Sequence, residues 1–317
     1  MRTARWQDLA YLDETFPLPL DRPFTAAEAR RDGGLTYDVL APLVARGFLR
    51  HPIRGVYVAA QVPDTLSLRC ACLRLVVPAD CVVVDRHAGW LHGAEMVLAP
   101  NEHIERQPVR VFRPAGRGRL RNGLTDSGER NLSASDITEV EGLRVSTPLR
   151  TAWDLGRQRW TDRAIAGVDQ MLRLRNFEKE ELLAGIERFR GMRWITTLRA
   201  IAPLADGRAE SPPESVLRLR WLEANLPAPE PQVEVWQDGT FLARVDLGHR
   251  ELRFAAEYDG AEWHSTPEQL AHDRARRTVL TREADWHVVA VRRDNLFGRW
   301  QDAEVLLRRG IELARQR

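Results

Sequence analysis

The C-terminal part of the sequence contains a dense group of ionisable residues in the stretch RVDLGHRELRFAAEYDGAEWH, residues 244–264. Its candidate catalytic residues are Asp246, Glu257, Asp259 and His264. The rest of the stretch has the pattern of two strands joined by a short loop. Because successive side chains of a strand point to opposite faces, Glu257 and Asp259 are expected to point the same way. Two carboxylates on one strand face indicate a bound cation, a catalytic role or a counter-ion.

A hairpin that is symmetric about residues 251–252 places Asp246 directly opposite Glu257, at the distance of neighbouring strands. Like charges that close repel each other. A Mg²⁺ ion, or Mn²⁺ in its place, would resolve the repulsion, because it binds carboxylate oxygens and keeps water ligands that attack a phosphodiester. Asp246 and Glu257 are therefore the predicted metal ligands. The alternative is a surface acid pair opposed by Arg244 or Arg253.

A regular order of elements must position these acids. Ser211 is the expected N-cap of a helix over residues 211–226, and Glu214, three residues later, completes a capping box there and is a further candidate for catalysis. The strands that follow are predicted over residues 232–236, 240–247 and 252–259, with a hairpin turn at Gln237-Asp238-Gly239. A helix over 267–284, a strand over 286–292 and a last helix from about 301 complete the order α-β-β-β-α-β-α.

This order, with Glu214 on the first helix, Asp246 on the second strand and Glu257 on the third, resembles the PD-(D/E)xK nuclease superfamily over about residues 208–300. The motifs SPPES, LPAPEPQ, ARVDL, EYDGAEWH, DRARR and WHVVAVR resemble, more narrowly, the domain of unknown function 559 family, which is related to very-short-patch-repair endonucleases. The resemblance implies a restriction-endonuclease-like fold and metal-dependent cleavage of DNA.

The sequence departs from the superfamily at the lysine expected after the third-strand acid. Residues 257–259 read Glu-Tyr-Asp, and the chain has a single lysine, Lys179. Arginine does not replace lysine as a proton acceptor, because a guanidinium keeps its proton in proteins. His264 is then the predicted general base, and Asp259 either binds metal or orients that histidine. The predicted phosphate clamps on the following helix are Arg274 and Arg277.

The first sixty residues predict a DNA-binding module. A short helix after Thr25, a glycine turn, a second helix over about residues 36–45 and two β-rich runs around residues 52–55 follow one another. This is the order of a winged helix-turn-helix, which binds double-stranded DNA. The alternative is a small helical domain that mediates protein contacts. The residues that such a module would turn toward DNA are Tyr37, Arg46, Arg50, His51 and Arg54, with Arg277 a further DNA contact from the last domain.

The middle of the chain predicts a mixed α/β segment. Residues 64–77 have a helical pattern, residues 109–114 and 142–146 read as strands, and a helix begins at Pro148. Residues 106–125 hold six arginines and no acid, which fits a solvated loop or an edge that contacts phosphates. The motifs GWLHG and STPLRTAWDL, together with the winged helix, make residues 1–200 resemble the two-part antitoxins of abortive-infection systems. That resemblance implies a cognate toxin as partner.

The cysteines favour no disulfide framework, because Cys70, Cys72 and Cys81 are odd in number and lie in an apolar stretch. They are predicted to be small core residues. A zinc site formed by them with His87 or His92 is the alternative, but the spacing matches no common ligand pattern.

Length and composition bound the class of protein. A chain of 317 residues suits several domains, here predicted as a winged helix over 1–60, an α/β segment over 61–201 and a restriction-endonuclease-like domain over 208–317, a mixed α/β class. The net charge of +2 excludes a strongly basic nucleic-acid binder. No apolar run approaches the ~20 residues that span a bilayer, and no signal core is visible, so a cytoplasmic protein without a membrane partner is predicted.

Three functions remain open on the sequence. The first is a protein that binds double-stranded DNA and hydrolyses it with Mg²⁺ or Mn²⁺, in DNA repair or phage defence. The second is an antitoxin-type transcriptional regulator whose last domain keeps a degenerate nuclease fold without cutting, which the missing lysine favours. The third is an adaptor that neutralises a toxin without binding metal.

Overall fold

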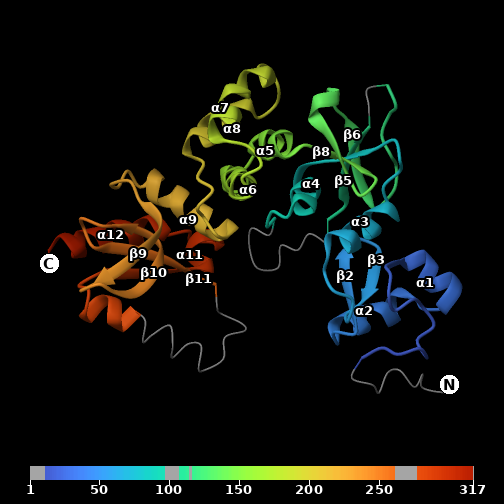
Figure 1. Cartoon of the computed structure of the whole chain (residues 1–317), viewed down its shortest axis with the longest axis horizontal. Helices are drawn as coiled ribbons and strands as arrows, with labels where there is room; N and C mark the ends of the chain where they lie inside the picture. Colours follow the sequence, from blue (N-terminus) through green and yellow to red (C-terminus); the bar gives the residue numbers. More distant parts are fainter. Residues whose placement is uncertain (1–10, 97–106, 114–115, 261–276, 317) are drawn as a thin grey trace. The chain divides into compact units, whose positions relative to one another are not determined.

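The computed structural model describes residues 11–96, 107–113, 116–260 and 277–316, which form two compact units. The first unit comprises Met1–Gly93 with Glu102–Thr151, and the second comprises Ala94–Asn101 with Ala152–Arg317. Helices and three sheets appear in the described residues, so the predicted mixed α/β class is confirmed (Figure 1). Among these residues, no helix is both long enough and apolar enough to cross a membrane.

The first unit begins with the predicted helix, turn, helix and ribbon. The elements are β1 (Phe24–Thr25), α1 (Ala26–Gly33), α2 (Tyr37–Ala45), β2 (Leu49–Ile53) and β3 (Val56–Ala59). Thr25 and Glu28 form a capping box that starts α1, and Gly34 ends the helix in the left-handed conformation, with φ of 66°. The three strands pair antiparallel in the order β1-β3-β2, and a core that includes Phe24, Leu40 and Tyr57 joins the helices to this sheet.

The rest of the first unit is built on a five-stranded sheet in the order β6-β5-β4-β8-β7. Its strands are β4 (Val82–Val83), β5 (Val109–Arg113), β6 (Thr125–Glu129), β7 (Ile137–Val140) and β8 (Leu143–Ser146). The helices of this part are α3 (Leu66–Arg74) and α4 (Asp85–His92), with a 3-10 turn at Ala134–Asp136. Ile53, Val56 and Val58 of the winged-helix ribbon pack into the same core as α3 and this sheet.

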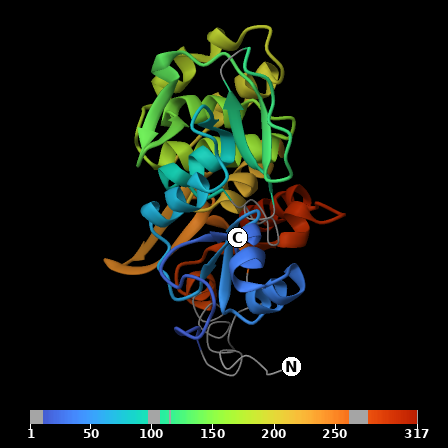
Figure 2. The same cartoon turned by 90° about the vertical axis from the view of Figure 1, so that its right-hand side faces the viewer.

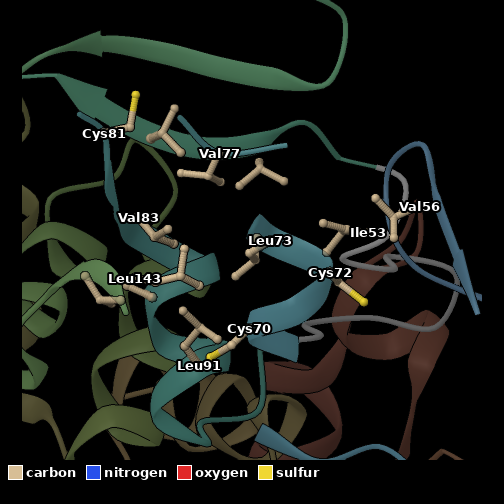
Figure 3. Close-up of a cluster of buried hydrophobic side chains, with 14 of the residues drawn as sticks. Ile53, Val56, Cys70, Cys72, Leu73, Val77, Cys81, Val83, Leu91 and Leu143 are labelled. Atoms are coloured by element: carbon tan, nitrogen blue, oxygen red, sulfur yellow. The ribbon is translucent and has the colours of Figure 1, made fainter. Parts of the chain in front are cut away.

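The three cysteines lie in that core and are not bonded to one another (Figure 3). Figure 3 shows their sulfur atoms pointing away from one another. Burial raises the pKa of Cys72 to about 12 and that of Cys81 to about 11, which keeps both thiols protonated. The prediction of small core residues is confirmed, and among the described residues the cysteines form no group with His87 or His92 that could hold a metal ion.

The second unit starts with a group of short helices, and the division between the units falls inside the first of them. These helices are α5 (Pro148–Gly156), α6 (Thr161–Arg173), α7 (Lys179–Ala184) and α8 (Ile195–Ile201), with 3-10 turns at Ile186–Phe189 and Ala202–Leu204. Both views show α5, α6 and α8 grouped together (Figures 1 and 2). Gly156 at the end of α5 is packed against Leu198 of α8 and Val168 of α6, where an added Cβ would lie only 2.5 Å and 3.2 Å from their methyl carbons.

The C-terminal part of the second unit has a four-stranded sheet in the order β12-β11-β10-β9. Its elements are α9 (Pro212–Glu223), β9 (Glu230–Gln237), β10 (Thr240–His249), β11 (Phe254–Asp259), a helix over 277–282, β12 (His287–Arg292), α11 (Arg293–Phe297) and α12 (Ala303–Arg315). β9, β10 and β11 pair antiparallel, and β12 joins β11 in parallel. The order agrees with the predicted one apart from the added short helix α11, and the first part of the predicted helix 267–284 lies outside the described residues.

Helices cover both faces of this sheet. Ala256 of β11 packs with Trp221 of α9 and with α12, whereas its neighbour Ala255 packs with Leu280 and Trp286. Because adjacent strand residues point to opposite faces, these two clusters lie on opposite sides of the sheet. The acids at the end of β11 are thereby carried by a strand that is buried on both faces.

The segment between α8 and α9, residues 202–211, connects the two predicted domains but packs closely against α6. Ala205 and Ala209 are buried, the N–H of Asp206 donates to Asp169 at 2.8 Å, and Gln170 donates to the carbonyl of Ala209 at 3.3 Å. The helices after residue 152 therefore belong to the same compact unit as the C-terminal sheet. The three-part domain division stays a prediction about independent folding.

Candidate functional site

The strand register brings the first two predicted acids together. β10 and β11 pair as Leu247 with Ala256 and Gly248 with Ala255, and the next step of the same register places Asp246 beside Glu257. The backbone pairing of these two strands ends at Leu247, and the carboxylate of Asp246 accepts the backbone N–H of Tyr258 at 2.7 Å. Just beyond the last backbone pair of β10 and β11, the side chain of Asp246 therefore links the two strands.

Arg277 supplies the positive charge at this site. Its Nε donates to Oε2 of Glu257 at 3.2 Å, and its Nη2 donates to Oδ2 of Asp259 at 3.2 Å. Glu257 is only 2% exposed, so its charge lies almost entirely out of water. Burial lowers the pKa of Arg277, but the hydrogen bond to Asp259 and the charge of Glu257 outweigh it, and the pKa ends above its usual value.

The alternative of an arginine-opposed acid pair therefore describes the observed contacts, although neither suggested arginine provides them. Arg244 donates to Glu210 at 2.8 Å and Arg253 to Asp285 at 3.4 Å. Arg277 was expected to contact phosphate or DNA. Its guanidinium is here engaged with two carboxylates.

Glu214 makes a helix cap that differs from the predicted box by one residue. Ser211 Oγ accepts the N–H of Glu214 at 3.4 Å, as an N-cap does. The carboxylate of Glu214 accepts the N–H of Glu210 at 2.8 Å, rather than that of Ser211, and the hydroxyl of Ser211 at 2.7 Å. A third bond, 2.8 Å long, comes from the side-chain amide of Gln232. The carboxylate of Glu214 thus accepts hydrogen bonds from three protein donors.

Gln232 is a member of the site that the sequence analysis missed. It lies on β9, between the paired positions Val245–Val233 and Leu247–Pro231, and so stands opposite Asp246 in the register. Its φ of 56° is unusual for a non-glycine residue inside a strand, and such conformations persist where the surroundings hold them. The turn at residues 238–239 alone would not have found Gln232, because an irregularity between Phe241 and Ala243 shifts the register of β9 on β10 by one residue.

The predicted metal ion would compete with Arg277 for the described acids. Asp246 and Glu257 are adjacent, but a guanidinium already occupies one oxygen of Glu257 and one of Asp259. Across residues 11–96, 107–113, 116–260 and 277–316, no group of three or more His, Cys, Asp and Glu side chains has the arrangement of a metal site. The predicted base His264 and the predicted clamp Arg274 lie outside the described residues.

Some of the predicted DNA-contacting side chains of the winged helix are exposed, and others form contacts within the protein. Tyr37, at the start of α2, is 72% exposed, and Arg54 is exposed at the turn between β2 and β3. Arg46 is also exposed, with its guanidinium 5.0 Å from the ring centre of Phe48. Arg50 instead donates to the carbonyl of Val62. His51 accepts the N–H of Gly55 at 3.0 Å and stacks on Tyr57 at 4.6 Å.

A hollow of about 680 Å³ lies between α1 and α2 beside Tyr37. Arg30 and Arg31 of α1 line it, and sequence reasoning did not single them out. Arg31 donates to the neighbouring Asp32 through two nitrogens, at 2.7 and 2.9 Å, whereas Arg30 is exposed. The face formed by α1 and the start of α2 thus combines the exposed Arg30 and Tyr37 with an arginine, Arg31, that is paired with Asp32.

The motifs of the antitoxin resemblance have structural roles. His92 of GWLHG is 2.8 Å from the carbonyl of Ser146. Arg150 of STPLRTAWDL donates to Asp136 at 2.8 Å, and both side chains are buried. Trp153 of the same motif donates to the carbonyl of Leu182 at 2.8 Å. These residues hold the domain together rather than lining a reaction site.

Two arginines of the arginine-rich segment lie on β5 and form ion pairs within the fold. Arg110 pairs with Asp85 at 3.3 Å and also with Asp126, and Arg113 pairs with Asp80 at 2.9 Å. Asp85 has a φ of 54° and is held by Arg130 as well, at 3.0 Å. Burial raises the pKa of the Asp85 carboxyl, but Arg130 and Arg110 outweigh that effect and leave it below its usual value.

Comparison with known proteins agrees with the antitoxin half of the resemblance. Residues 79–204 match the family described as AbiEi antitoxin C-terminal domain. Two similar relatives are Uncharacterized protein Rv2248 and Uncharacterized protein MT2308 from two strains of Mycobacterium tuberculosis, each 32% identical over 259 residues. The alignment covers 81% of this chain and 90% of each relative. The family match ends before α9, so the relation of the last domain to nucleases stays a prediction. The chain belongs to the same family as these mycobacterial proteins and carries an AbiEi antitoxin C-terminal domain at residues 79–204.

Proposed function

We propose that this protein is an antitoxin-type transcriptional regulator that binds double-stranded DNA through its winged helix and a cognate toxin through its antitoxin domain. The observation that carries the proposal is the pairing, in one chain, of the AbiEi antitoxin domain with a β1-β3-β2 winged helix that exposes Tyr37 at the start of α2. In helix-turn-helix proteins the first residues of the second helix contact base edges.

The charge of the winged helix supports the same proposal. Arg30 on α1, Arg46 after α2 and Arg54 on the β-ribbon are exposed on three separate elements. Phosphate contacts of this kind supply most of the affinity of DNA-binding proteins and fix their orientation on the duplex. Tyr37 and Arg54 are the two side chains expected to contribute most to DNA binding. Among the described residues, neither has a protein partner whose contact would have to break.

The last domain supports regulation without cleavage. Arg277 compensates the charges of Glu257 and Asp259, and Glu214 accepts hydrogen bonds from three protein donors. No lysine follows Glu257 in the third strand. In this proposal the three acids Glu214, Glu257 and Asp259 have a structural role, because their contacts hold elements of the last domain together.

Metal-dependent hydrolysis of DNA is the second candidate function. One observation favours it: Gln232, Asp246 and Glu257 occupy neighbouring register positions on three adjacent strands, and Gln232 links this row to Glu214. That is the layout implied by the nuclease resemblance. Hydrolysis would require Arg277 to leave the oxygens of Glu257 and Asp259.

Binding of the full chain to duplex DNA tests the proposed function. A fluorescent duplex from the region upstream of the protein's own gene is titrated at 50 and 200 mM salt, next to an unrelated duplex. We expect tighter binding to the first duplex, an affinity that falls steeply with salt, and a loss of roughly tenfold in Tyr37→Ala and Arg54→Glu. Arg308→Glu, at an exposed arginine of α12, is the matched control and should bind as the wild type does.

Two outcomes of that titration would reject the proposal. Undetectable or salt-insensitive binding would favour the adaptor that neutralises a toxin without DNA. Equal losses in Arg54→Glu and Arg308→Glu would show that overall charge, rather than the winged helix, drives binding.

A further inference from the structure

Two loops in the helical part of the second unit repeat the same arrangement. Residues 157–160 lead from α5 to Trp160, the N-cap residue of α6, and residues 190–194 lead to Trp194, the N-cap residue of α8. In each loop an arginine directly precedes the tryptophan and lies over its ring. The guanidinium carbon is 4.8 Å from the ring centre for Arg159 and 5.1 Å for Arg193.

Arg157 joins the two loops into one surface. Its guanidinium lies 4.5 Å from the ring centre of Phe189, and its Nη1 is 2.9 Å from the sulfur of Met192. Asp154 of α5 holds the same guanidinium at 3.0 Å. Residues 157–160 and 188–194, called here the arginine–tryptophan surface, are therefore in contact through Arg157. They flank the helices α5, α6 and α8, which Figure 1 shows grouped together.

This surface carries several arginines and two exposed apolar side chains. Trp160 is 59% exposed and Met192 is 42% exposed. The nearby acid Glu187 is already engaged, because it binds Arg190 at 2.9 Å and Arg199 at 2.7 Å. In the part of the chain that the structure describes, neither Arg159 nor Arg193 forms an ion pair with a carboxylate.

We propose that the arginine–tryptophan surface binds single-stranded nucleic acid. Proteins that bind single strands combine cationic groups along the phosphate backbone with aromatic rings on which unpaired bases stack. Arg159 and Arg193 supply the first part, and the exposed indole of Trp160 supplies the second. Duplex DNA does not offer its base faces to such a ring.

The composition of the surface favours nucleic acid over a protein partner. Protein interfaces have a core from which charged residues are depleted. Here the exposed apolar groups, Trp160 and Met192, stand among arginines instead of forming a continuous apolar core. The site is also separate from the DNA face of the winged helix, so this proposal does not depend on the proposed regulatory function.

The test measures binding of the full chain to fluorescein-labelled twelve-nucleotide oligo(dT) and oligo(U) by anisotropy at 50 mM salt. We expect Trp160→Ala to weaken binding roughly tenfold, because stacking on one aromatic ring is worth about that much per base. Trp160→Phe keeps a ring and should retain most of the affinity. The double variant Arg159→Glu/Arg193→Glu should bind more weakly still, with a smaller dependence on salt.

Arg299 and Trp300 provide a matched control. Arg299 lies 5.6 Å from the ring centre of Trp300, which is 81% exposed, so the pair repeats the local arrangement as a single unit. Trp300→Ala and Arg299→Glu should bind the oligonucleotides as the wild type does. Circular dichroism and thermal unfolding verify that each variant is folded.

Three results of these titrations would overturn the proposal. The first is no binding of either oligonucleotide by the wild type. The second is equal binding by Trp160→Ala and the wild type, and the third is a loss in the Trp300→Ala control as large as that in Trp160→Ala.

Competition with poly-L-glutamate separates base stacking from charge alone. If it displaces the oligonucleotides as well as an unlabelled single strand of equal charge does, the surface binds acidic polymers in general, as a protein partner's acidic face would. Duplex binding, affected by Arg54→Glu, should be unchanged in Trp160→Ala.

Discussion

The guanidinium of Arg218 on α9 lies 2.7 Å from the carboxylate of Asp169 on α6, and both side chains are buried. Arg218 also donates to the carbonyl of Leu204 at 2.5 Å, and Asp169 accepts the N–H of Asp206 at 2.8 Å. The first helix of the C-terminal sheet domain is therefore tied, through buried charges, to a helix of the antitoxin domain. We expect these helices to fold as one cooperative unit.

Breaking this ion pair from either side should destabilise the second unit. Asp169→Ala or Arg218→Ala leaves a buried charge without its partner, which costs about 3–5 kcal/mol. The double variant Asp169→Leu/Arg218→Met should lose less than the sum of the single losses, because no uncompensated charge remains. Chemical denaturation of the four proteins measures the coupling. Additive losses would show that the two charges do not stabilise each other.

The stability of the same pair should depend on pH. Burial raises the pKa of Asp169 to about 6, and the nearby charge of Arg218 opposes that rise without cancelling it. The folded state then holds the proton more tightly than the unfolded state, so the contribution of Asp169 is most favourable below about pH 4 and is lost as the pH rises through about 6. Measured against Asp169→Asn, the wild type should lose relative stability between pH 4 and 7. A constant difference between the two proteins would contradict the raised pKa.

Local signals in the sequence predicted much of this fold. Thr25 and Glu28 start α1, the turn at 238–239 joins β9 to β10, and the hairpin about 251–252 places Asp246 beside Glu257. Each depends on residues a few positions apart, where capping, turn geometry and side-chain alternation act directly. Such signals fix which residues share a face or a register.

Long-range pairing of charges could not be predicted in the same way. Arg218 meets Asp169 across 49 positions, and Arg277 meets Glu257 across 20. Sequence periodicity placed Arg277 on a helix but did not distinguish an arginine that clamps phosphate from one that neutralises an acid. The partner is decided by how helices dock on the sheet, which depends on packing of the whole unit.

The cysteines should be inert in the native protein. Cys70, Cys72 and Cys81 are buried in one core, and burial raises the pKa of each thiol. Because the thiolate is the reactive form, a thiol reagent such as Ellman's reagent should label the native chain far more slowly than the unfolded chain, in which all three thiols react. Added zinc should change neither rate. Fast labelling of one native thiol would show that this core opens readily.

The contacts of Arg277 lead to a prediction about divalent ions. Because its guanidinium already compensates Glu257 and Asp259, Mg²⁺, Mn²⁺ and EDTA should leave the thermal unfolding of the wild type unchanged. Arg277→Ala removes the partner of a buried carboxylate and should cost about 1–3 kcal/mol, part of which Mg²⁺ or Mn²⁺ would restore. Arg253→Ala is the control, because Arg253 and its partner Asp285 are both exposed and their pair contributes little.

A plasmid-cleavage assay decides between the regulator and the nuclease. Supercoiled plasmid incubated with the wild type and Mg²⁺ or Mn²⁺ should stay intact, since the acids are held by arginine and the third strand lacks the superfamily lysine. Metal-dependent cleavage by the wild type that disappears in Glu257→Ala and Asp246→Ala would replace the regulator with the nuclease. The pH profile would then identify the proton acceptor. Activity that rises between about pH 6 and 7 and falls roughly 100-fold in His264→Ala would assign that role to the histidine, whereas a profile that survives the substitution would exclude it.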